Sequence, residues 1–117
     1  MKGKAEKIKE NIIIGPFPES SDLKKLKEKF KVTAIISLLD PELPYENSLI
    51  EVESKRVKKL GLKFYNFPMT SSNLNSEKNS KSLKKIVELI KTNPNEVYYI
   101  HCYKGKHRVT LIKELFK

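Results

Sequence analysis

The chain has 117 residues, of which 38% are hydrophobic and 32% are charged. This length suits one domain with a modest core and leaves no room for a separate cofactor domain, and the composition excludes a wholly disordered chain. The net charge of +10 predicts anionic partners.

The predicted elements alternate between strands and helices. Short apolar runs predict buried strands, and apolar residues that recur every three or four positions predict helices. In chain order the prediction is a strand at 11–14, a helix at 22–31, a strand at 32–39, a helix at 48–60, a strand at 62–67, a helix at 77–92, a strand at 97–100 and a helix at 109–116.

Local signals mark the ends of these elements. Ser20 and Ser21 are expected to cap the first helix, and Gly61 is expected to end the second helix in the left-handed conformation. Residues 40–47 and 68–76 are expected to be loops that leave strands. The alternation predicts an α/β sandwich of three layers, with a central, mostly parallel sheet of four or five strands and ligands beyond their carboxyl ends.

Other features narrow the class of protein. The apolar stretch at 32–39 is far shorter than the roughly 20 residues of a membrane span, so no membrane span is expected. The charged N-terminus lacks the apolar part of a secretion signal, which predicts a cytoplasmic protein. Cys102 is the single cysteine, which excludes an internal disulfide and a cysteine-rich zinc site.

The loop at 101–108 carries the strongest chemical signal. It reads His-Cys-Tyr-Lys-Gly-Lys-His-Arg, between a predicted strand and a predicted helix. Backbone N–H groups and a helix N-terminus at this place favour a nucleophilic thiolate at Cys102. The same amides and the forked guanidinium of Arg108 can hold a phosphate, and Gly105 permits close approach of the backbone to the anion. The segment predicts a phosphate-binding loop with a reactive cysteine.

This loop resembles that of the cysteine-dependent protein tyrosine and dual-specificity phosphatases, whose His-Cys-x5-Arg signature matches His101, Cys102 and Arg108. Residues 104–108 and the Pro-Glu-Leu-Pro-Tyr-Glu-Asn segment at 41–47 look like the atypical members of plants and fungi. The resemblance covers about residues 10–117. It implies a phosphatase fold without a metal or other cofactor, and inositol pyrophosphates or phosphoproteins as substrates. It also implies that His101 orients the cysteine.

Three features depart from the family pattern. Val109 follows the loop arginine where serine or threonine is usual, with Thr110 one position later, so breakdown of a phosphoenzyme is expected to be slow. The loop at 68–76 lacks the usual acidic residue, and the chain stops soon after Arg108, where further helices usually follow. We interpret residues 1–117 as a single phosphatase-like domain that is short at its C-terminus.

Candidate site residues surround this loop. Asp40 ends the second predicted strand at the same sheet edge, where it could protonate a leaving group or simply form the turn before Pro41. Without a stronger acid, aryl phosphates and pyrophosphates are expected to be the better substrates, because their leaving groups have a low pKa. Substrate contacts are expected at Tyr103, Lys104, Gly105, Lys106 and His107, although packing for Tyr103 and plain exposure for His107 are equally open.

The predicted function is that of a hydrolase that removes phosphate from phosphoproteins or inositol phosphates through a phosphocysteine at Cys102. The alternative is a phosphatase-like module that binds phosphorylated ligands with little turnover. Nucleic acid is not the expected partner, because the lysines are spread along the whole chain and no stripe of aromatic and arginine residues is present. The oligomeric state stays open.

Overall fold

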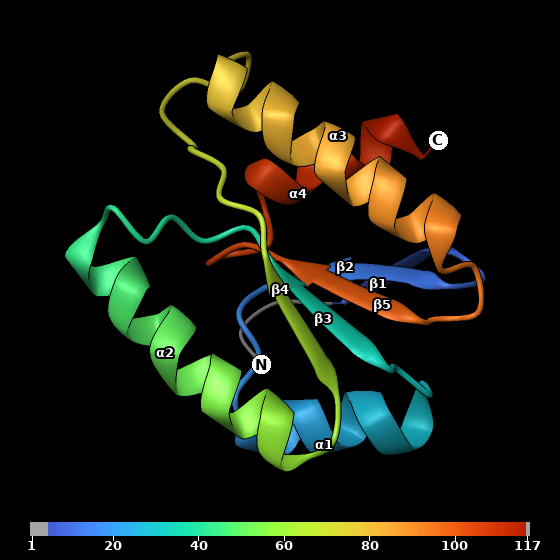
Figure 1. Cartoon of the computed structure of the whole chain (residues 1–117). Coiled ribbons are helices and arrows are strands. Elements are labelled where there is room, and N and C mark those ends of the chain that lie inside the picture. The colour runs from blue at the N-terminus through green and yellow to red at the C-terminus, as the bar shows by residue number, and fades with distance from the viewer. Residues whose placement is uncertain (1–4, 117) are drawn as a thin grey trace.

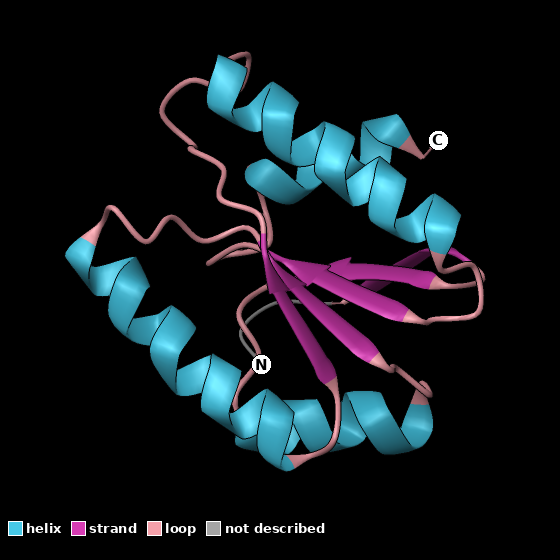
Figure 2. Ribbon diagram, viewed as in Figure 1, coloured by secondary structure: helices cyan, strands magenta, loops and turns pink. Residues whose placement is uncertain are grey.

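The structure is a computed structural model that describes residues 5–116. In chain order the elements are β1 (Glu6–Lys9), β2 (Ile12–Gly15), α1 (Ser20–Lys29), β3 (Ala34–Ser37), α2 (Pro44–Lys59), β4 (Lys63–Asn66), α3 (Glu77–Thr92), β5 (Tyr98–His101) and α4 (Arg108–Leu115). Helices α1 and α2 cover one face of the sheet, and α3 and α4 cover the other (Figure 1). The three layers of the predicted α/β sandwich are visible in Figure 2.

The strand order in the sheet is β1-β2-β5-β3-β4. Strands β2, β5, β3 and β4 are parallel, and β1 pairs antiparallel with β2, which confirms the predicted mostly parallel sheet. Strand β1 was not predicted. Its residues are charged and largely exposed apart from Ile8, so it lacks the apolar run by which the other strands are recognised.

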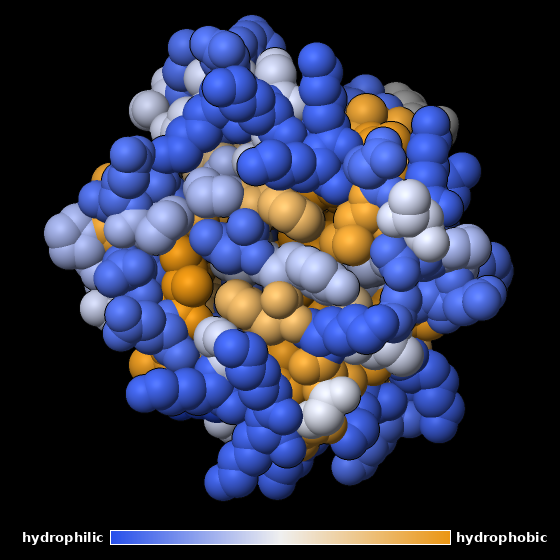
Figure 3. All heavy atoms as spheres, in the orientation of Figure 1, coloured by the Kyte–Doolittle hydropathy of each residue, from blue (hydrophilic) through white to orange (hydrophobic). Residues whose placement is uncertain are grey.

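Two hydrophobic clusters fill the space between the layers, because successive strand residues point to opposite faces of the sheet. The cluster beneath α3 and α4 includes Ile12, Ile14, Ile36, Tyr98, Ile100, Ile86 and Ile112. The cluster beneath α1 and α2 includes Ile13, Ile35, Tyr99, Leu23, Leu26 and Val57. Hydrophilic atoms cover most of the outer face seen in Figure 3, in keeping with the many lysines of the sequence.

The helix starts differ from the expected ones. The prediction that Ser20 or Ser21 caps α1 was wrong, because the N-cap is Glu19 and its side chain accepts from the N–H of Asp22. The carboxylate of Asp22 in turn accepts from the N–H of Glu19 at 2.9 Å, which completes a capping box. Helix α2 begins at Pro44 rather than Ser48, since proline suits a first helical turn that needs no N–H donor.

The other predicted ends differ from the observed ones by at most two residues, and those of α3 agree. Every predicted helix and strand overlaps one in the structure, and Gly61 follows α2 with a φ of 77° as expected. Among residues 5–116, none of the helices combines the length and the apolar character that crossing a membrane requires.

Three loops meet at the carboxyl edge of the parallel strands. The N–H of Leu38, after β3, donates to the carbonyl of His101 at the end of β5 at 2.8 Å. The N–H of Met69, after β4, donates to the carbonyl of Leu38 at 3.0 Å. The chain that follows β5 therefore leaves the sheet beside the loops after β3 and β4, and this edge is where the ligand site of such a fold is expected.

Candidate phosphate-binding site

Cys102 and Arg108 lie at the two ends of the loop between β5 and α4. Cys102 directly follows β5 and is 2% exposed, and Arg108 is the first residue of α4 and is 5% exposed. The loop is anchored from outside, because the N–H of Phe17 donates to the carbonyl of Tyr103 at 3.0 Å. The structure thus brings the predicted nucleophile and the predicted phosphate ligand to one buried place.

Gly105 in the middle of this loop has no room for a side chain. Its φ is 72°, in the left-handed region that favours glycine. A Cβ atom there would lie 2.6 Å from the backbone nitrogen of Pro16 and 2.8 Å from the carbonyl carbon of Gly15. The segment after β2 therefore packs directly against the loop, and both the backbone conformation and this contact require glycine.

The guanidinium of Arg108 is held on one edge by Glu46 from the first turn of α2. Nη1 donates to Oε1 and Nη2 donates to Oε2, both at 2.9 Å, and Nη1 also donates to the carbonyl of Met69 at 3.1 Å. Within residues 5–116, the buried Nε of Arg108 has no hydrogen-bond partner. A buried N–H donor that the protein leaves unsatisfied is suited to an oxygen of a phosphate.

Both partners of this ion pair are held in the charged state. Burial raises the pKa of Glu46, but the hydrogen bonds from Arg108 and from the N–H of Asp40 outweigh it, so that this pKa lies below its usual value. Burial lowers the pKa of Arg108, and the hydrogen bonds to Glu46 raise it by more. The site therefore keeps a permanent cation that is oriented by a carboxylate.

Asp40 lies next to this pair but is engaged elsewhere. Its N–H donates to Glu46 Oε1 at 2.8 Å, while its Oδ2 accepts from Lys78 Nζ of α3 at 2.7 Å. Burial raises the pKa of Asp40, but the hydrogen bonds from Lys78 and from the N–H of Glu42 bring it below its usual value. Asp40 is thus a carboxylate held by Lys78, and its role as a general acid stays a prediction.

The remaining predicted residues lie along the loop. Tyr103 is half-buried, and its hydroxyl is 2.8 Å from that of Tyr45 on α2, with the two rings edge to face. This hydrogen bond raises the pKa of Tyr45. The side chains of Lys104, Lys106 and His107 are exposed.

The two positions after the loop arginine differ in their surroundings. Val109 is buried, and the Thr110 hydroxyl donates to the carbonyl of His107. The hydroxyl that follows Arg108 is therefore engaged with the backbone of the loop. Within residues 5–116, His, Cys, Asp and Glu side chains do not gather in a group of three that could hold a metal ion.

Three supporting residues were not recognised in the sequence: Glu46, Glu53 and Lys78. Glu46 falls in the segment 41–47 that carried the family resemblance, but its contact with Arg108 spans 62 positions of the chain. Glu53 lies 2.6 Å from His101, with both side chains fully buried. The only signal for Glu53 and Lys78 is a charge on a helix, which by itself does not distinguish a buried carboxylate or a bridging lysine from a solvated one.

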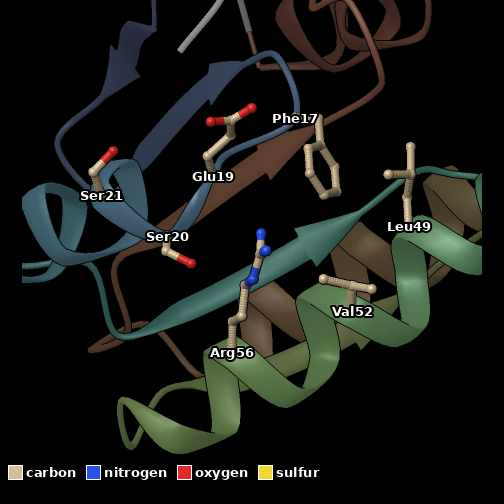
Figure 4. A pocket seen from close by; sticks show the side chains of 7 residues that line it. All are labelled: Phe17, Glu19, Ser20, Ser21, Leu49, Val52 and Arg56. Carbon is tan, nitrogen blue, oxygen red and sulfur yellow. The ribbon is translucent and has the colours of Figure 1, made fainter.

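A pocket of about 540 Å³ opens beside this site, between the start of α1 and α2 (Figure 4). It is lined by Phe17, Glu19, Ser20, Ser21, Leu49, Val52 and Arg56, and therefore by neither Cys102 nor Arg108. Phe17 connects the two places, because its ring also contacts His101 edge-on at 5.7 Å between centroids.

The chain is similar in sequence and in structure to a known phosphatase. Inositol diphosphatase SIW14 of Saccharomyces cerevisiae is 33% identical over 94 residues, which are 79% of this chain and 31% of that protein. The crystal structure of the core catalytic domain of the PP-IP phosphatase SIW14 from S. cerevisiae, in complex with citrate, superposes with a TM-score of 0.70 at 28% identity, over 93% of this chain and 61% of that one.

A second solved structure shares the fold. It is a DUF442 protein from Shewanella putrefaciens CN-32, with a TM-score of 0.77 at 14% identity, over 96% of this chain and 68% of that one. The chain spans only 31% of the length of the curated relative that it matches. Residues 5–115 match the model of the tyrosine phosphatase family. The chain therefore belongs to the tyrosine phosphatase family.

Proposed function

We propose that the chain is a cysteine-dependent phosphatase whose nucleophile is Cys102. The observation that carries this proposal is the state of Arg108: it is buried, both Nη atoms are held by Glu46, and its Nε lacks a partner within residues 5–116. A buried, oriented and unsatisfied guanidinium in a loop headed by a cysteine is suited to two oxygens of a phosphate that the thiolate attacks.

The proposed reaction has two steps. The Cys102 thiolate attacks phosphorus, the bond from phosphorus to the leaving oxygen breaks, and that oxygen departs with the electron pair. It takes a proton from solvent, or from Asp40 at a pH low enough to protonate that carboxylate. Arg108 and the loop N–H groups hold the other phosphate oxygens in the transition state. Water then attacks the phosphocysteine, which releases inorganic phosphate and the thiolate. The second step is expected to be slow, because Val109 stands where a hydroxyl would assist thiolate departure.

The substrate class we favour is an inositol pyrophosphate, with phosphoproteins as the second possibility. A relative bears the name inositol diphosphatase. With Asp40 held as a carboxylate by Lys78, a leaving group that needs no proton is preferred. When Cys102 takes the terminal phosphoryl group of an inositol pyrophosphate, the phosphate that remains on the inositol is such a leaving group. The exposed Lys104 and Lys106 add positive charge to the loop, which suits a densely anionic substrate.

The first experiment is hydrolysis of p-nitrophenyl phosphate by the purified chain in metal-free buffer, beside a Cys102→Ser variant. We expect activity in the parent and loss of at least 100-fold in the variant. Intact mass after a rapid quench is expected to show one added phosphoryl group on the parent only. If the folded parent binds phosphate but shows neither turnover nor a phosphoryl adduct, the proposal of a phosphatase is wrong and the alternative of a phosphate-binding module is favoured.

The second experiment separates the substrates. Phosphate release is compared for an inositol pyrophosphate, a phosphotyrosine peptide and a phosphoserine peptide, and the pyrophosphate is expected to give the highest kcat/KM. A Lys104→Gln/Lys106→Gln variant is expected to lower that value and to weaken its salt dependence. The matched control is Lys24→Gln/Lys25→Gln, which removes the same charge from the exposed face of α1. Equal effects of the two double variants would exclude a specific role of the loop lysines.

A further inference from the structure

His101 and Glu53 form a buried charged pair beneath the phosphate-binding loop. His101 is the last residue of β5 and Glu53 lies on α2, and neither side chain has any exposed surface. Nε2 of the histidine is 2.6 Å from Oε2 of the carboxylate, which is an ion-pair distance without the alignment of a hydrogen bond. An ionisable pair that is completely removed from water needs a physical reason to be there.

The contacts of the imidazole determine where its protons lie. Nδ1 is 3.1 Å from the carbonyl oxygen of Cys102, and a carbonyl can only accept, so Nδ1 carries a proton. At 2.6 Å, an unprotonated Nε2 and an ionised carboxylate would repel each other, so the pair holds a second proton. An imidazolium paired with a carboxylate accounts for both protons.

The surroundings keep the pair dry and contain few other titratable groups. Phe17 contacts the imidazole edge-on and Tyr99 stacks on it at 5.9 Å between centroids. Burial, and then the charges of Glu53, Asp22 and Cys102, raise the pKa of Tyr99, so that its hydroxyl stays neutral. Asp22 is part of the cap of α1, and the third group whose charge acts on Tyr99 is the thiol of Cys102 itself.

The two members of the pair lie at different distances from the loop. The Nδ1 side of the ring faces the backbone of Cys102, and Glu53 lies on the opposite, Nε2 side. The positive member is therefore nearer to the loop than the negative one. His101 and Cys102 are both buried, and in a buried place, where water screens charges less, a cation on the residue before a thiol favours the thiolate.

We propose that Glu53 is a positioning residue that holds His101 as an imidazolium and thereby keeps Cys102 ready as a thiolate. The inference deepens the proposed function and rests on its assignment of Cys102 as the nucleophile. Glu53 acts only through His101. The pair also ties the end of β5 to α2, and a purely structural role would consist of this tie alone.

The test uses the reactivity of Cys102, which is the only cysteine, so that alkylation reports one site. The rate of carbamidomethylation by iodoacetamide is followed by intact mass from pH 4 to 9 in the parent and in Glu53→Gln, which keeps the size of the side chain and removes its charge. We expect the midpoint of the pH profile to move up by about one pH unit in Glu53→Gln, with the same plateau rate at high pH.

The control is Glu51→Gln, which removes a charge from an exposed position of the same helix and is expected to leave the profile unchanged. Coincident profiles for the parent and a folded Glu53→Gln would overturn the proposal and leave only the structural tie. Because alkylation needs no turnover, this result is independent of the phosphatase assay. Absence of p-nitrophenyl phosphate hydrolysis by the parent would instead refute the proposed function.

A measurement on the unmodified chain covers the case in which Glu53→Gln fails to fold. The ¹⁵N chemical shifts of the two histidines at pH 7 distinguish an imidazolium from either neutral tautomer, and a His107→Asn variant assigns the signals to His107 and His101. We expect the imidazolium pattern for His101. A neutral ring would overturn the proposal, since Glu53 would then hold the proton itself.

Discussion

Glu46 and Arg108 meet through two parallel hydrogen bonds of 2.9 Å, although 62 positions separate them in the chain. The carboxylate takes up one edge of the guanidinium and orients it, while the Nε edge stays available to a ligand. Burial of two charges is costly, and the bidentate geometry offsets this cost by satisfying both carboxylate oxygens. The pair therefore supports both the fold and the candidate phosphate site.

Replacing Glu46 with glutamine is expected to lower both the stability of the fold and the activity. The guanidinium of Arg108 would remain buried without its counter-charge, and the free energy of unfolding should fall by about 3 kcal/mol. Its orientation would also loosen, so kcat/KM for p-nitrophenyl phosphate should fall by about 100-fold. Urea denaturation and steady-state kinetics measure the two effects. Unchanged values for both would show that Arg108 is oriented without the carboxylate.

Replacing Gly105 with alanine is expected to damage the loop more than a positive φ alone explains. Gly61 is the matched control, because its φ is 77° and a Cβ there would meet no atom within 4 Å. Gly61→Ala should cost about 1 kcal/mol for the strained backbone. Gly105→Ala should lower the free energy of unfolding by clearly more than Gly61→Ala does, and should also lower activity, because the Cβ would press on Pro16. Equal losses of stability with full activity would contradict the packing argument.

Replacing Lys78 with methionine is expected to change the preference for leaving groups. Without the ammonium, the pKa of Asp40 should rise, and the residue can then carry a proton to a poor leaving group. Turnover of a phosphoserine peptide relative to p-nitrophenyl phosphate should increase below about pH 5. The gain should disappear when Asp40→Asn is added. Lys81→Met, on the exposed side of α3, is the control, and a gain in that variant would attribute the effect to charge alone.

The free energy of unfolding is expected to fall as the pH is lowered through the pKa values of Glu46 and Asp40. The pKa values of Glu46 and Asp40 are lower in the folded chain than their ordinary values of 4.5 and 3.8, so their contribution is complete above those values and is lost as the pH falls through the folded ones. The urea midpoint should therefore drop below about pH 4.5. The drop should be smaller in Glu46→Gln than in Glu51→Gln, and an identical acid profile in these two variants would exclude Glu46 as a source.

The residues of the candidate phosphate-binding loop could be grouped from the sequence because they are close together in the chain. His101, Cys102, Gly105 and Arg108 occupy one short segment, and the alternation of strands and helices places that segment at a sheet edge. The supporting charges are different in kind. The contact between Lys78 and Asp40 spans 38 positions, and such a pairing depends on how the elements pack rather than on local periodicity.

Strand β1 and the cap of α1 illustrate two further limits of the sequence. The residues of β1 are mostly charged, and they form a strand because β2 offers a free edge beside them. At the start of α1, three neighbouring residues can accept an N–H, and the reciprocal bonds of Glu19 and Asp22 win over either serine. In both cases several hydrogen-bonding arrangements are possible, and the sequence pattern alone does not show which of them is the most stable.

Helix α2 supplies the carboxylates of both buried pairs, Glu46 to Arg108 and Glu53 to His101. The two glutamates are seven positions apart, which is close to two full turns, so they project from one side of the helix. A single residue inserted or deleted between them would rotate one carboxylate by about 100° relative to the other. The register of this helical segment is thus as restricted as the length of the loop at 101–108, and relatives should tolerate substitutions there far better than insertions or deletions.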